Sequence, residues 1–300
     1  MISIIIPFFN TGESCAELVK QLLNDKQRDL EIICIDDCST DDSFKKIATV
    51  CKKDKRARVV KQDKNQGSAA SRNRGLEEAT GDYIVFIDSD DDVADLFLSK
   101  MLEAISEEDV CLAVCGIRQN YLHSNKIVDK FTEPGSERRD GEKWEEYILR
   151  LMVEDAHLYS CVNKIYDASV IKRGKVRFNT ELDFAEDTKF VLDYLKAAGD
   201  NIINFVPDPL YTYNYGTPTS VVSESSLRWK NWEKNFADIK TFVGRNPSKY
   251  AQKLLKKLYL RFKISHALAV ARSKKSFREK IHYENPFVLI CARIIVALRG

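Results

Sequence analysis

The feature that most constrains the fold is a regular alternation of short apolar runs and amphipathic segments. Residues 2–6, ISIII, are apolar and β-branched apart from Ser3, which predicts a strand buried on both faces. Helical spacing of apolar residues follows over 14–24. The order repeats, with strands predicted at 31–35, 57–61, 82–87 and about 109–116, and helices at 41–52, 67–79 and from about Asp95. Such alternation predicts right-handed βαβ units and a parallel sheet.

The rhythm changes after residue 117. We expect a hairpin and loop over 117–140, helices over 143–154 and 187–198, and a short strand followed by a tyrosine-rich turn within 202–215. From about residue 226 the pattern is helical. With 44% hydrophobic and 31% charged residues among 300, the composition is that of a globular protein and excludes a disordered chain.

Polar residues gather where the predicted strands end. Ligands of open parallel sheets bind outside the carboxyl ends of the strands. The residues found there are Pro7 and Asn10 after the first strand, Asp36 and Asp37 after the second, Gly67 and Arg72 after the third, and the string DSDDD at 88–92 after the fourth. Acids this close repel one another, and a divalent cation offsets that cost, so we expect a metal site.

The chain lacks the glycine-rich phosphate loops G-x-x-x-x-G-K-[ST] and G-x-G-x-x-G. Their absence argues against an ATPase and against a nicotinamide-dependent enzyme. A hard metal ion held by few carboxylates has coordination positions left for phosphate oxygens, which suits a nucleoside diphosphate.

The strings SIIIPFFN, IDDCSTDDS and NQGSAASRNRGLEEATGDYIVFIDSDD occur in this order over residues 2–92. This set resembles an inverting family 2 glycosyltransferase of the GT-A fold, of the bacterial polysaccharide type. NKIY, AEDTKF and YTYNYGTPTS continue the resemblance more weakly. It implies an α/β fold with a Rossmann-like, mainly parallel sheet flanked by helices. A catalytic domain would span 1–225, with a nucleotide-binding part at 1–116 and an acceptor-binding part at 117–225, followed by a helical region at 226–300.

The resemblance also implies roles for the residues at the strand ends. Asp37 would receive the uracil imide, since that N–H would otherwise be buried without a partner. Asp90 would bind Mn²⁺ or Mg²⁺, and Asp92 either binds the metal directly or supports a ligand. Asp88 would hold the ribose or the donor sugar. The remaining contacts to a UDP-sugar would come from Pro7, Asn10, Asp36, Gly67, Arg72 and Ser89. Read without the resemblance, Arg72 is a surface helix arginine.

The pair Glu186–Asp187 matches the catalytic acids of that family. We expect Asp187 to take the proton from the acceptor hydroxyl and Glu186 to orient the acceptor, with Glu186 as the next candidate base. A single displacement then inverts the anomeric configuration. The alternative interpretation of the pair is an acidic helix start.

Two positions depart from the family pattern. Val162 stands where the family often has tryptophan, and the run 213–215 reads Tyr-Asn-Tyr without an arginine, although Ser220 is retained. The tyrosines of this run are predicted either to lie in the core or to stack on sugars.

Two other functions stay open at this point. A sugar nucleotidyltransferase would be expected to carry a glycine-rich basic stretch after the first strand, where this chain has Thr11-Gly12-Glu13. A nucleotide-sugar-binding module without catalysis is disfavoured by the acidic motifs.

The cysteines do not indicate a disulfide protein. Cys34, Cys38, Cys111 and Cys115 lie in or beside apolar runs and are predicted to be small buried side chains rather than zinc ligands. The N-terminal residues lack the pattern of a secretory signal. We therefore expect reduced thiols and a cytoplasmic location.

Charge is distributed unevenly along a chain whose net charge is +2. Residues 229–300 hold 17 Lys/Arg and 4 Asp/Glu, a net +13, which leaves −11 for residues 1–228. Within 249–263 a stripe of Leu254, Leu255, Leu258 and Phe262 accompanies five lysines, and 285–299 is an apolar run too short to span a bilayer. Residues 249–300 are therefore predicted either to dock on the catalytic domain or to bind the anionic inner face of the plasma membrane.

The predicted partners follow from these features. They are a nucleotide sugar, a glycan or lipid-linked glycan acceptor, and the membrane surface. No nucleic-acid partner is predicted, because no binding motif accompanies the charge, and a homo-oligomer is left open.

Overall fold

The structure is a computed structural model that describes residues 1–25, 29–131, 138–154, 156–182, 184–216 and 228–272. The chain forms two compact units. The first comprises residues 1–137, 157–181 and 186–220, and the second comprises residues 138–156, 182–185 and 221–300. Each unit is described by itself.

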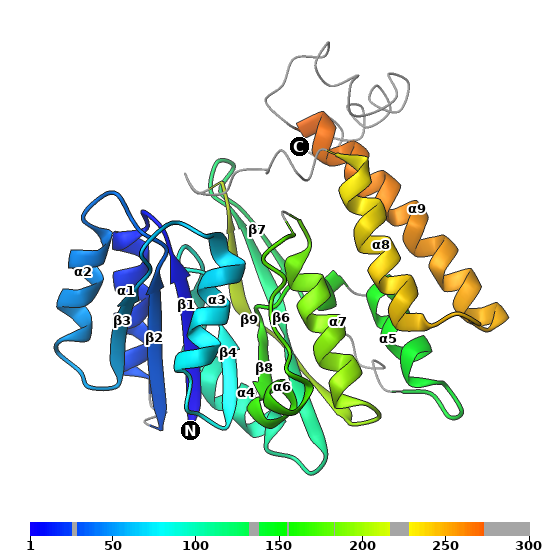
Figure 1. The fold of residues 1–300 in the computed structure, drawn as a ribbon, viewed down its shortest axis with the longest axis horizontal. Coiled ribbons are helices and arrows are strands. Elements are labelled where there is room, and N and C mark those ends of the chain that lie inside the picture. The colour runs from blue at the N-terminus through cyan, green and yellow to red at the C-terminus, as the bar shows by residue number, and fades with distance from the viewer. Residues whose placement is uncertain (26–28, 132–137, 155, 183, 217–227, 273–300) are drawn as a thin grey trace. The chain divides into compact units, whose positions relative to one another are not determined.

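The first unit is built on a nine-stranded sheet in the order β3-β2-β1-β4-β8-β6-β9-β5, with β7 paired to β6. The strands are β1 (Ile2–Phe8), β2 (Leu30–Asp36), β3 (Ala57–Lys61), β4 (Tyr83–Phe86), β5 (Asp92–Val93), β6 (Val110–Tyr121), β7 (Lys126–Lys130), β8 (Lys164–Asp167) and β9 (Ile202–Tyr215). The helices are α1 (Gly12–Asn24), α2 (Ser43–Cys51), α3 (Gly67–Glu78), α4 (Phe97–Ile105), α6 (Ala168–Gly174) and α7 (Glu186–Ala198) (Figure 1).

The predicted parallel arrangement is confirmed for the first four strands. β1 pairs in parallel with β2 and with β4, and β2 pairs in parallel with β3. Every residue of β1 and β2 is buried, because helices cover both faces of this part of the sheet. The predicted hairpin after residue 117 is also present, as β6 and β7.

Three details of the sheet differ from the prediction. β1 continues through Pro7 and ends at Phe8. Its pairing with β4 ends at Ile5, so Pro7, which has no N–H to donate, faces no hydrogen-bonded partner strand on that side. β8, in the string NKIY, runs antiparallel to β4 and to β6. The predicted tyrosine-rich turn is instead the end of β9, one strand of 14 residues. Pro207 lies at a bulge within this strand, where Cys115 pairs with Val206 and Gly116 pairs with Pro209.

The core under α3 and α7 is aromatic. The rings of Phe178 and Phe190 stack with centroids 4.0 Å apart, and Phe86 meets both edge-on. As predicted, Cys34, Cys111 and Cys115 are buried small side chains. Cys38 is the exception, because it stands half-buried in the loop after β2 with φ +64°.

The second unit is a small helical assembly of α5 (Trp144–Glu154), α8 (Trp229–Val243) and α9 (Lys249–Arg272), which pack on one another. The sequence grouped 143–154 with the acceptor-binding part, whereas α5 belongs to this unit. The second unit contains a buried ion pair, in which Arg150 donates to both carboxylate oxygens of Glu142, each at 2.8 Å. The functional division of the chain stays a prediction.

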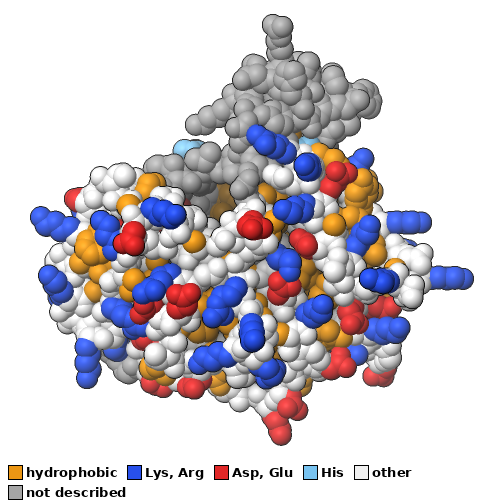
Figure 2. Space-filling view, in the orientation of Figure 1, with side chains coloured by type: hydrophobic (Ala, Val, Ile, Leu, Met, Phe, Trp, Pro, Cys, Tyr) orange, Lys and Arg blue, Asp and Glu red, His pale blue; other side chains and the backbone are white. Residues whose placement is uncertain are grey.

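Three of the four residues of the predicted apolar stripe of α9 are buried inside this unit, and the fourth, Leu255, is half-buried. Leu254, Leu258 and Phe262 are buried, and the Phe262 ring meets the rings of Trp232 and Phe236 of α8. The opposite side of α9 is exposed, and basic side chains project from the surface where α8 and α9 lie (Figure 2). Among the described residues, no helix is long and apolar enough to cross a bilayer. The predicted apolar run at 285–299 lies outside the described residues.

Candidate active site

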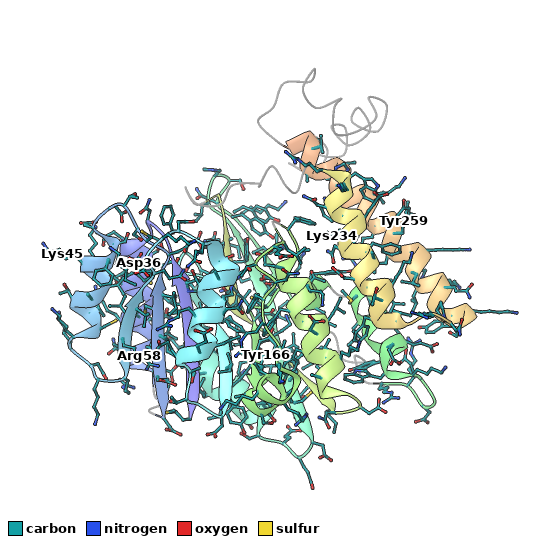
Figure 3. All side chains as sticks on the ribbon, viewed as in Figure 1. Asp36, Lys45, Arg58, Tyr166, Lys234 and Tyr259 are labelled. Carbon is teal, nitrogen blue, oxygen red and sulfur yellow. The ribbon has the colours of Figure 1, made fainter. Side chains whose placement is uncertain are left out.

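The turns that follow β1 and β2 are tied together at the carboxyl edge of the sheet, near Asp36 in Figure 3. Asn10 has φ +53°, and its side-chain oxygen accepts from the backbone N–H of Thr40 at 2.9 Å. Its backbone N–H donates to the Ser39 hydroxyl at 3.1 Å. Asn10 thus fixes the loop after β2, while Pro7 is buried inside β1 rather than in the turn.

Asp36, the last residue of β2, and Asp37, which follows it, are both buried but differ in their partners. One carboxylate oxygen of Asp36 accepts from Ser39 N at 2.8 Å, and the other is buried without a hydrogen bond among the described residues. Asp37 accepts from Gln62 Nε2 at 2.7 Å and from the backbone N–H groups of Gln66 and Gly67 at 2.8 Å each. A carboxylate accepts about four hydrogen bonds. Asp37 therefore anchors the start of α3 and still has capacity for one more donor.

Arg72 is the central cation of the site. Its side chain is buried, with 4% of the residue exposed, and its guanidinium donates to Asp88 at 2.7 Å and to Asp187 at 3.1 Å. The guanidinium also lies over the Phe178 ring, 5.4 Å from its centroid. The interpretation of Arg72 as a surface arginine is thus wrong. The residue instead joins three elements: α3, the loop after β4 and the start of α7.

The pair Glu186–Asp187 begins α7. One oxygen of Asp187 accepts from Arg72, and the other accepts from Cys161 N at 3.4 Å and Ser160 Oγ at 3.5 Å. Glu186 accepts from Ser68 Oγ at 3.4 Å. Burial, followed by the neighbouring charge of Asp187, raises the pKa of Glu186. Both acids therefore face α3, as a shared active-site role requires.

Lys164 shapes the loop that meets Asp187, a role that sequence reasoning missed. Its ammonium group is buried and donates to the carbonyl oxygens of His157, Ser160 and Val162. Gathering these carbonyls leaves the N–H of Cys161 directed at Asp187. The string NKIY at 163–166, which contains Lys164, was the sequence signal from which this role could have been found. Val162 is buried here and offers no ring for stacking.

The string DSDDD forms the loop after β4. Burial raises the pKa of Asp88 despite the opposing charge of Arg72, and the charges of Asp187 and Asp90 raise it further. The hydroxyls of Ser89 and Thr11 lie 2.8 Å apart, which joins this loop to the start of α1. Asp90 is half-buried and Asp92 is exposed.

Three residues that the sequence did not single out as a group hold this loop. Asp91 is buried and accepts from Tyr211 Oη at 2.6 Å and from Asn214 N at 2.9 Å. The Asn214 amide donates to the Asp90 carbonyl at 2.9 Å and to the Asp92 carboxylate at 2.8 Å. Burial and the charge of Asp88 raise the pKa of Asp91 to about 8. Asn214 lies in the Tyr-Asn-Tyr run at 213–215, which lacks the arginine of the family pattern. Here it holds the DSDDD loop in place through these hydrogen bonds.

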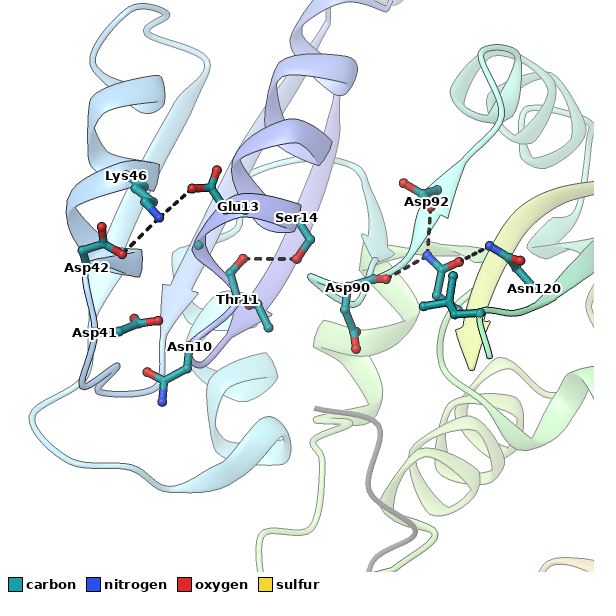
Figure 4. Close-up of a pocket in the computed structure, with 13 residues that line it drawn as sticks. Asn10, Thr11, Glu13, Ser14, Asp41, Asp42, Lys46, Asp90, Asp92 and Asn120 are labelled. Carbon is teal, nitrogen blue, oxygen red and sulfur yellow. Dashed lines mark hydrogen bonds and ion pairs between the residues drawn. The ribbon is translucent and has the colours of Figure 1, made fainter. Parts of the chain in front are cut away.

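A cavity of about 510 Å³ opens beside the loop, a size that suits a small-molecule ligand. It is lined by Asn10, Thr11, Gly12, Glu13, Ser14, Asp41, Asp42, Lys46, Asp90, Asp92, Asn120, Leu122 and Asn214 (Figure 4). Lys46 pairs with Glu13 at 2.6 Å and with Asp42 at 3.2 Å. Asp90 and Asp92 are the acids of the DSDDD loop that line this cavity.

The donor chemistry of this loop fits a hard divalent cation. Carboxylate oxygens are the ligands that Mg²⁺ and Mn²⁺ prefer, and Mg²⁺ typically uses one or two carboxylates together with substrate phosphates. Among the described residues no three acidic, histidine or cysteine side chains converge as a closed metal site. The two carboxylates of this loop that line the cavity, Asp90 and Asp92, suit a cation that is shared with a ligand. Of the two, Asp92 also accepts from Asn214.

Comparison with known proteins decides the family. The sequence profile of glycosyl transferase family 2 matches residues 3–174. The chain belongs to this family. It is 28% identical over 232 residues to the glycosyltransferase GlyG of Streptococcus pneumoniae, covering 76% of this chain and 75% of GlyG. The chain spans 56–75% of the length of the first three curated relatives it matches.

Solved structures agree on the fold of this family 2 glycosyltransferase. TarS 1–349 of S. aureus superposes with a TM-score of 0.69 at 22% identity, covering 97% of this chain and 80% of the 1–349 fragment. The mannosyltransferase PcManGT of Pyrobaculum calidifontis, in complex with GDP-Man and Mn²⁺, superposes with a TM-score of 0.62 at 14% identity, covering 100% of this chain and 75% of PcManGT. The predicted GT-A fold and the predicted transferase class are confirmed.

Proposed function

We propose that this glycosyltransferase moves a sugar from a UDP-sugar to a hydroxyl of a glycan acceptor, with inversion and with a bound divalent cation, in the synthesis of a cell-surface polysaccharide. The observation that carries the proposal is the buried Arg72, which bridges Asp88 of the DSDDD loop and Asp187 of α7. A donor-binding acid and a candidate base are thereby held on one guanidinium. UDP-GlcNAc and Mn²⁺, bound by TarS and PcManGT, support the donor and cation classes.

The donor side of the site is formed by residues from four loops. The remaining acceptor capacity of Asp37 suits the uracil imide N–H, beside the turn fixed by Asn10. Asp88 would hold the ribose or donor sugar, with Gly67 and Ser89 as neighbouring contacts. A divalent cation on Asp90, supported by Asp92, would neutralise the diphosphate.

The acceptor side centres on Asp187. This carboxylate would take the proton of the acceptor hydroxyl while that oxygen attacks the anomeric carbon and the bond to the diphosphate breaks. Arg72 and the N–H of Cys161 hold Asp187 in place, and Arg72 also places positive charge near the departing diphosphate. Glu186, at the same helix start, would orient the acceptor.

Release of UDP tests this function directly. The full chain is incubated with UDP-glucose, UDP-galactose and their N-acetyl forms, with Mn²⁺, Mg²⁺ or EDTA, and UDP is measured. We expect metal-dependent release from one donor, and a β-linked product from an α-linked donor once an acceptor is supplied. UDP binding without release from any donor would favour the non-catalytic binding module. Formation of a UDP-sugar from UTP and a sugar phosphate would favour a nucleotidyltransferase.

The proposed acceptor is lipid-linked, and the proposed location is the cytoplasmic face of the plasma membrane. α9 contains no acidic residue from Lys249 to Arg272. Its exposed side carries Lys253, Lys256 and Lys257 together with Leu260 and Ile264, which are 60% and 49% exposed. Each lysine near an anionic surface contributes about 1 kcal/mol, and apolar side chains among them can insert at the interface. This exposed side replaces the buried stripe as the proposed contact.

Co-sedimentation with vesicles tests the membrane contact. The full chain should pellet with phosphatidylserine-containing vesicles and release as salt rises, because screening shortens the attraction. Lys253→Glu/Lys257→Glu should lose this binding. Lys45→Glu/Lys52→Glu, at exposed positions of the first unit, makes the same change in charge and serves as the control. Equal loss in both variants would show that only net charge matters, and no loss in the first would remove α9 as the contact.

A further inference from the structure

A short segment of the second unit directly precedes the proposed catalytic pair. Residues 182–185 belong to the second unit, whereas residues 157–181 and 186–220, on either side in the sequence, belong to the first. Glu186 and Asp187 follow this segment and begin α7. Whatever holds residues 182–185 therefore acts, through one peptide bond, on the residues that carry the proposed transfer step.

Phe184 fixes this segment within the second unit. Its ring meets the Trp232 ring of α8, with centroids 4.9 Å apart and planes tilted by 48°. The Trp232 ring also meets the rings of Phe262 and His266 of α9, and both of these side chains are buried. Aromatic rings at such distances attract one another beyond the area they bury. Phe184 is therefore held by a ring that α9 holds in turn.

The start of α7 is fixed separately, within the first unit. Asp187 accepts from Arg72 at 3.1 Å, and the Thr188 hydroxyl donates to the carbonyl oxygen of Tyr159 at 3.0 Å. These hydrogen bonds hold the first turn of the helix from the side of the active site. Ala185 thus joins two segments whose positions are each determined by other contacts.

Ala185 adopts a backbone conformation that its side chain disfavours. Its φ is +62°, in the left-handed region. In that region the Cβ of an L-residue lies too close to a neighbouring carbonyl oxygen, a cost that glycine avoids. Such a conformation persists only where the surrounding structure determines it. The contact of Phe184 with Trp232 on one side, and the start of α7 on the other, supply that constraint.

We propose that Phe184 and Trp232 are positioning residues for the transfer step. Their contact holds Ala185 in its left-handed conformation, which sets the direction of the backbone as it enters Glu186 and Asp187. Without the contact, Ala185 relaxes toward negative φ and the first turn of α7 shifts. This inference rests on the proposed function, and it gives the second unit a part in the reaction besides the proposed membrane contact.

Kinetics of UDP release from the donor that the wild-type chain uses separate positioning from binding. Phe184→Ala should lower kcat roughly tenfold, because a small displacement of a reacting group is costly. The KM for the UDP-sugar and the calorimetric affinity for UDP should stay within about twofold, since the proposed donor contacts lie on other loops. Trp232→Ala should also lower kcat, and the double variant should lose no more than the larger single loss. Phe184→Tyr, which keeps the ring, should retain the wild-type kcat.

A matched control removes the same side chain elsewhere in the second unit. Phe236 is a half-buried phenylalanine of α8 whose ring meets those of Tyr259 and Phe262. Phe236→Ala therefore loosens the packing of α8 on α9 and leaves the contact of Phe184 in place. Its kcat should stay close to that of the wild-type chain.

Ala185→Gly tests the backbone argument. Because glycine adopts positive φ without a steric cost, adding Ala185→Gly to Phe184→Ala should restore kcat by roughly threefold. Hydrogen exchange gives a measurement that needs no activity. In Phe184→Ala, but not in Phe236→Ala, the amides of residues 186–192 should exchange about threefold faster or more.

Four results would overturn the proposal. Equal losses of kcat in Phe184→Ala and Phe236→Ala would assign the effect to the stability of the second unit. A higher KM with an unchanged kcat would make Phe184 a binding residue. A lack of recovery with Ala185→Gly would remove the role of the left-handed backbone, and unchanged exchange over 186–192 would show that α7 does not depend on the contact. The proposed function fails separately, if the wild-type chain releases no UDP from any donor, and the exchange experiment does not depend on that result.

Discussion

At the two ends of the parallel strands β1, β2 and β4, the pKa values of acidic side chains are shifted in opposite directions. At the amino end, Glu31 accepts from Ser3 Oγ at 2.6 Å, Thr80 N at 2.7 Å and Arg58 at 2.6 Å. Burial alone would raise its pKa, but these donors outweigh burial and lower the pKa to about 2. At the carboxyl end, the pKa values of Asp88 and Asp91 are raised. Figure 3 marks the two ends by Arg58 and Asp36.

The difference lies in how many donors reach each acid. The amino end surrounds one carboxylate with donors, which stabilises its charge and the fold. The carboxyl end brings several acids together around one buried cation, Arg72. Added positive charge is therefore favourable only at the carboxyl end, which is where a divalent cation or a transferred proton would arrive.

The largest expected effect is on Asp187. Asp187→Asn removes the proposed base but keeps the shape of the side chain, so transfer should fall by about 10²-fold or more while UDP affinity is retained. The measurements are product formation and calorimetric binding of UDP. Asp193→Asn changes an acid on the same helix, one that pairs with Lys189, and should keep its activity. An active Asp187→Asn enzyme would move the base to Glu186.

Asp90 should show the next largest effect. Asp90→Asn removes the proposed metal ligand, and UDP affinity in the presence of Mn²⁺ or Mg²⁺ should fall about 10- to 100-fold, toward the affinity measured in EDTA. Calorimetry with and without metal provides the measurement. Asp95→Asn, at an exposed position beyond the loop, is the control. An unchanged dependence on metal would assign the cation to other acids.

The sequence predicted the carboxyl edge well because the residues there follow apolar strands directly. Asp36, Asp37 and Asp88 could be placed by chain order alone. The partners of the acids at this edge could not be placed in the same way, because they are distant in the sequence. Arg72 and Asp187 are 115 positions apart, and Asn214 and Asp92 are 122 positions apart. What covers the apolar stripe of α9 could not be predicted for a related reason. Periodicity shows that Leu254 and Leu258 share a face but not what covers that face, which here is the interior of the second unit.

A smaller effect is expected at Asp91, which contacts no proposed ligand. Asp91→Asn exchanges one acceptor oxygen for an amide, so either Tyr211 Oη or Asn214 N loses its partner. We expect a loss of about 1–3 kcal/mol in the free energy of unfolding, measured in urea. Tyr211→Phe removes the same hydrogen bond from the other side. The double variant should therefore lose less than the sum of the two single losses, and simple additivity would contradict the coupling.

The smallest effect is expected at Glu31 and depends on pH. Because its folded-state pKa of about 2 lies below its ordinary value of 4.5, the stability it contributes is present above pH 4.5 and is lost as pH falls toward 2. Glu31→Gln keeps an acceptor for Ser3 and Thr80 but loses the charge that faces Arg58. The variant should be about 1 kcal/mol less stable at pH 7 and should lose less stability than wild type between pH 4.5 and 2.5.

Urea unfolding at pH 7, 4.5, 3.5 and 2.5 measures this difference. Glu17→Gln, which alters an exposed pair with Lys20, is the control and should follow the wild-type curve. Parallel curves for Glu31→Gln and wild type would mean that the donors around Glu31 do not stabilise its charge. The two ends of the strands would then differ only in the crowding of acids at the carboxyl end. The Asp187 and Asp90 variants would be the remaining tests of that difference.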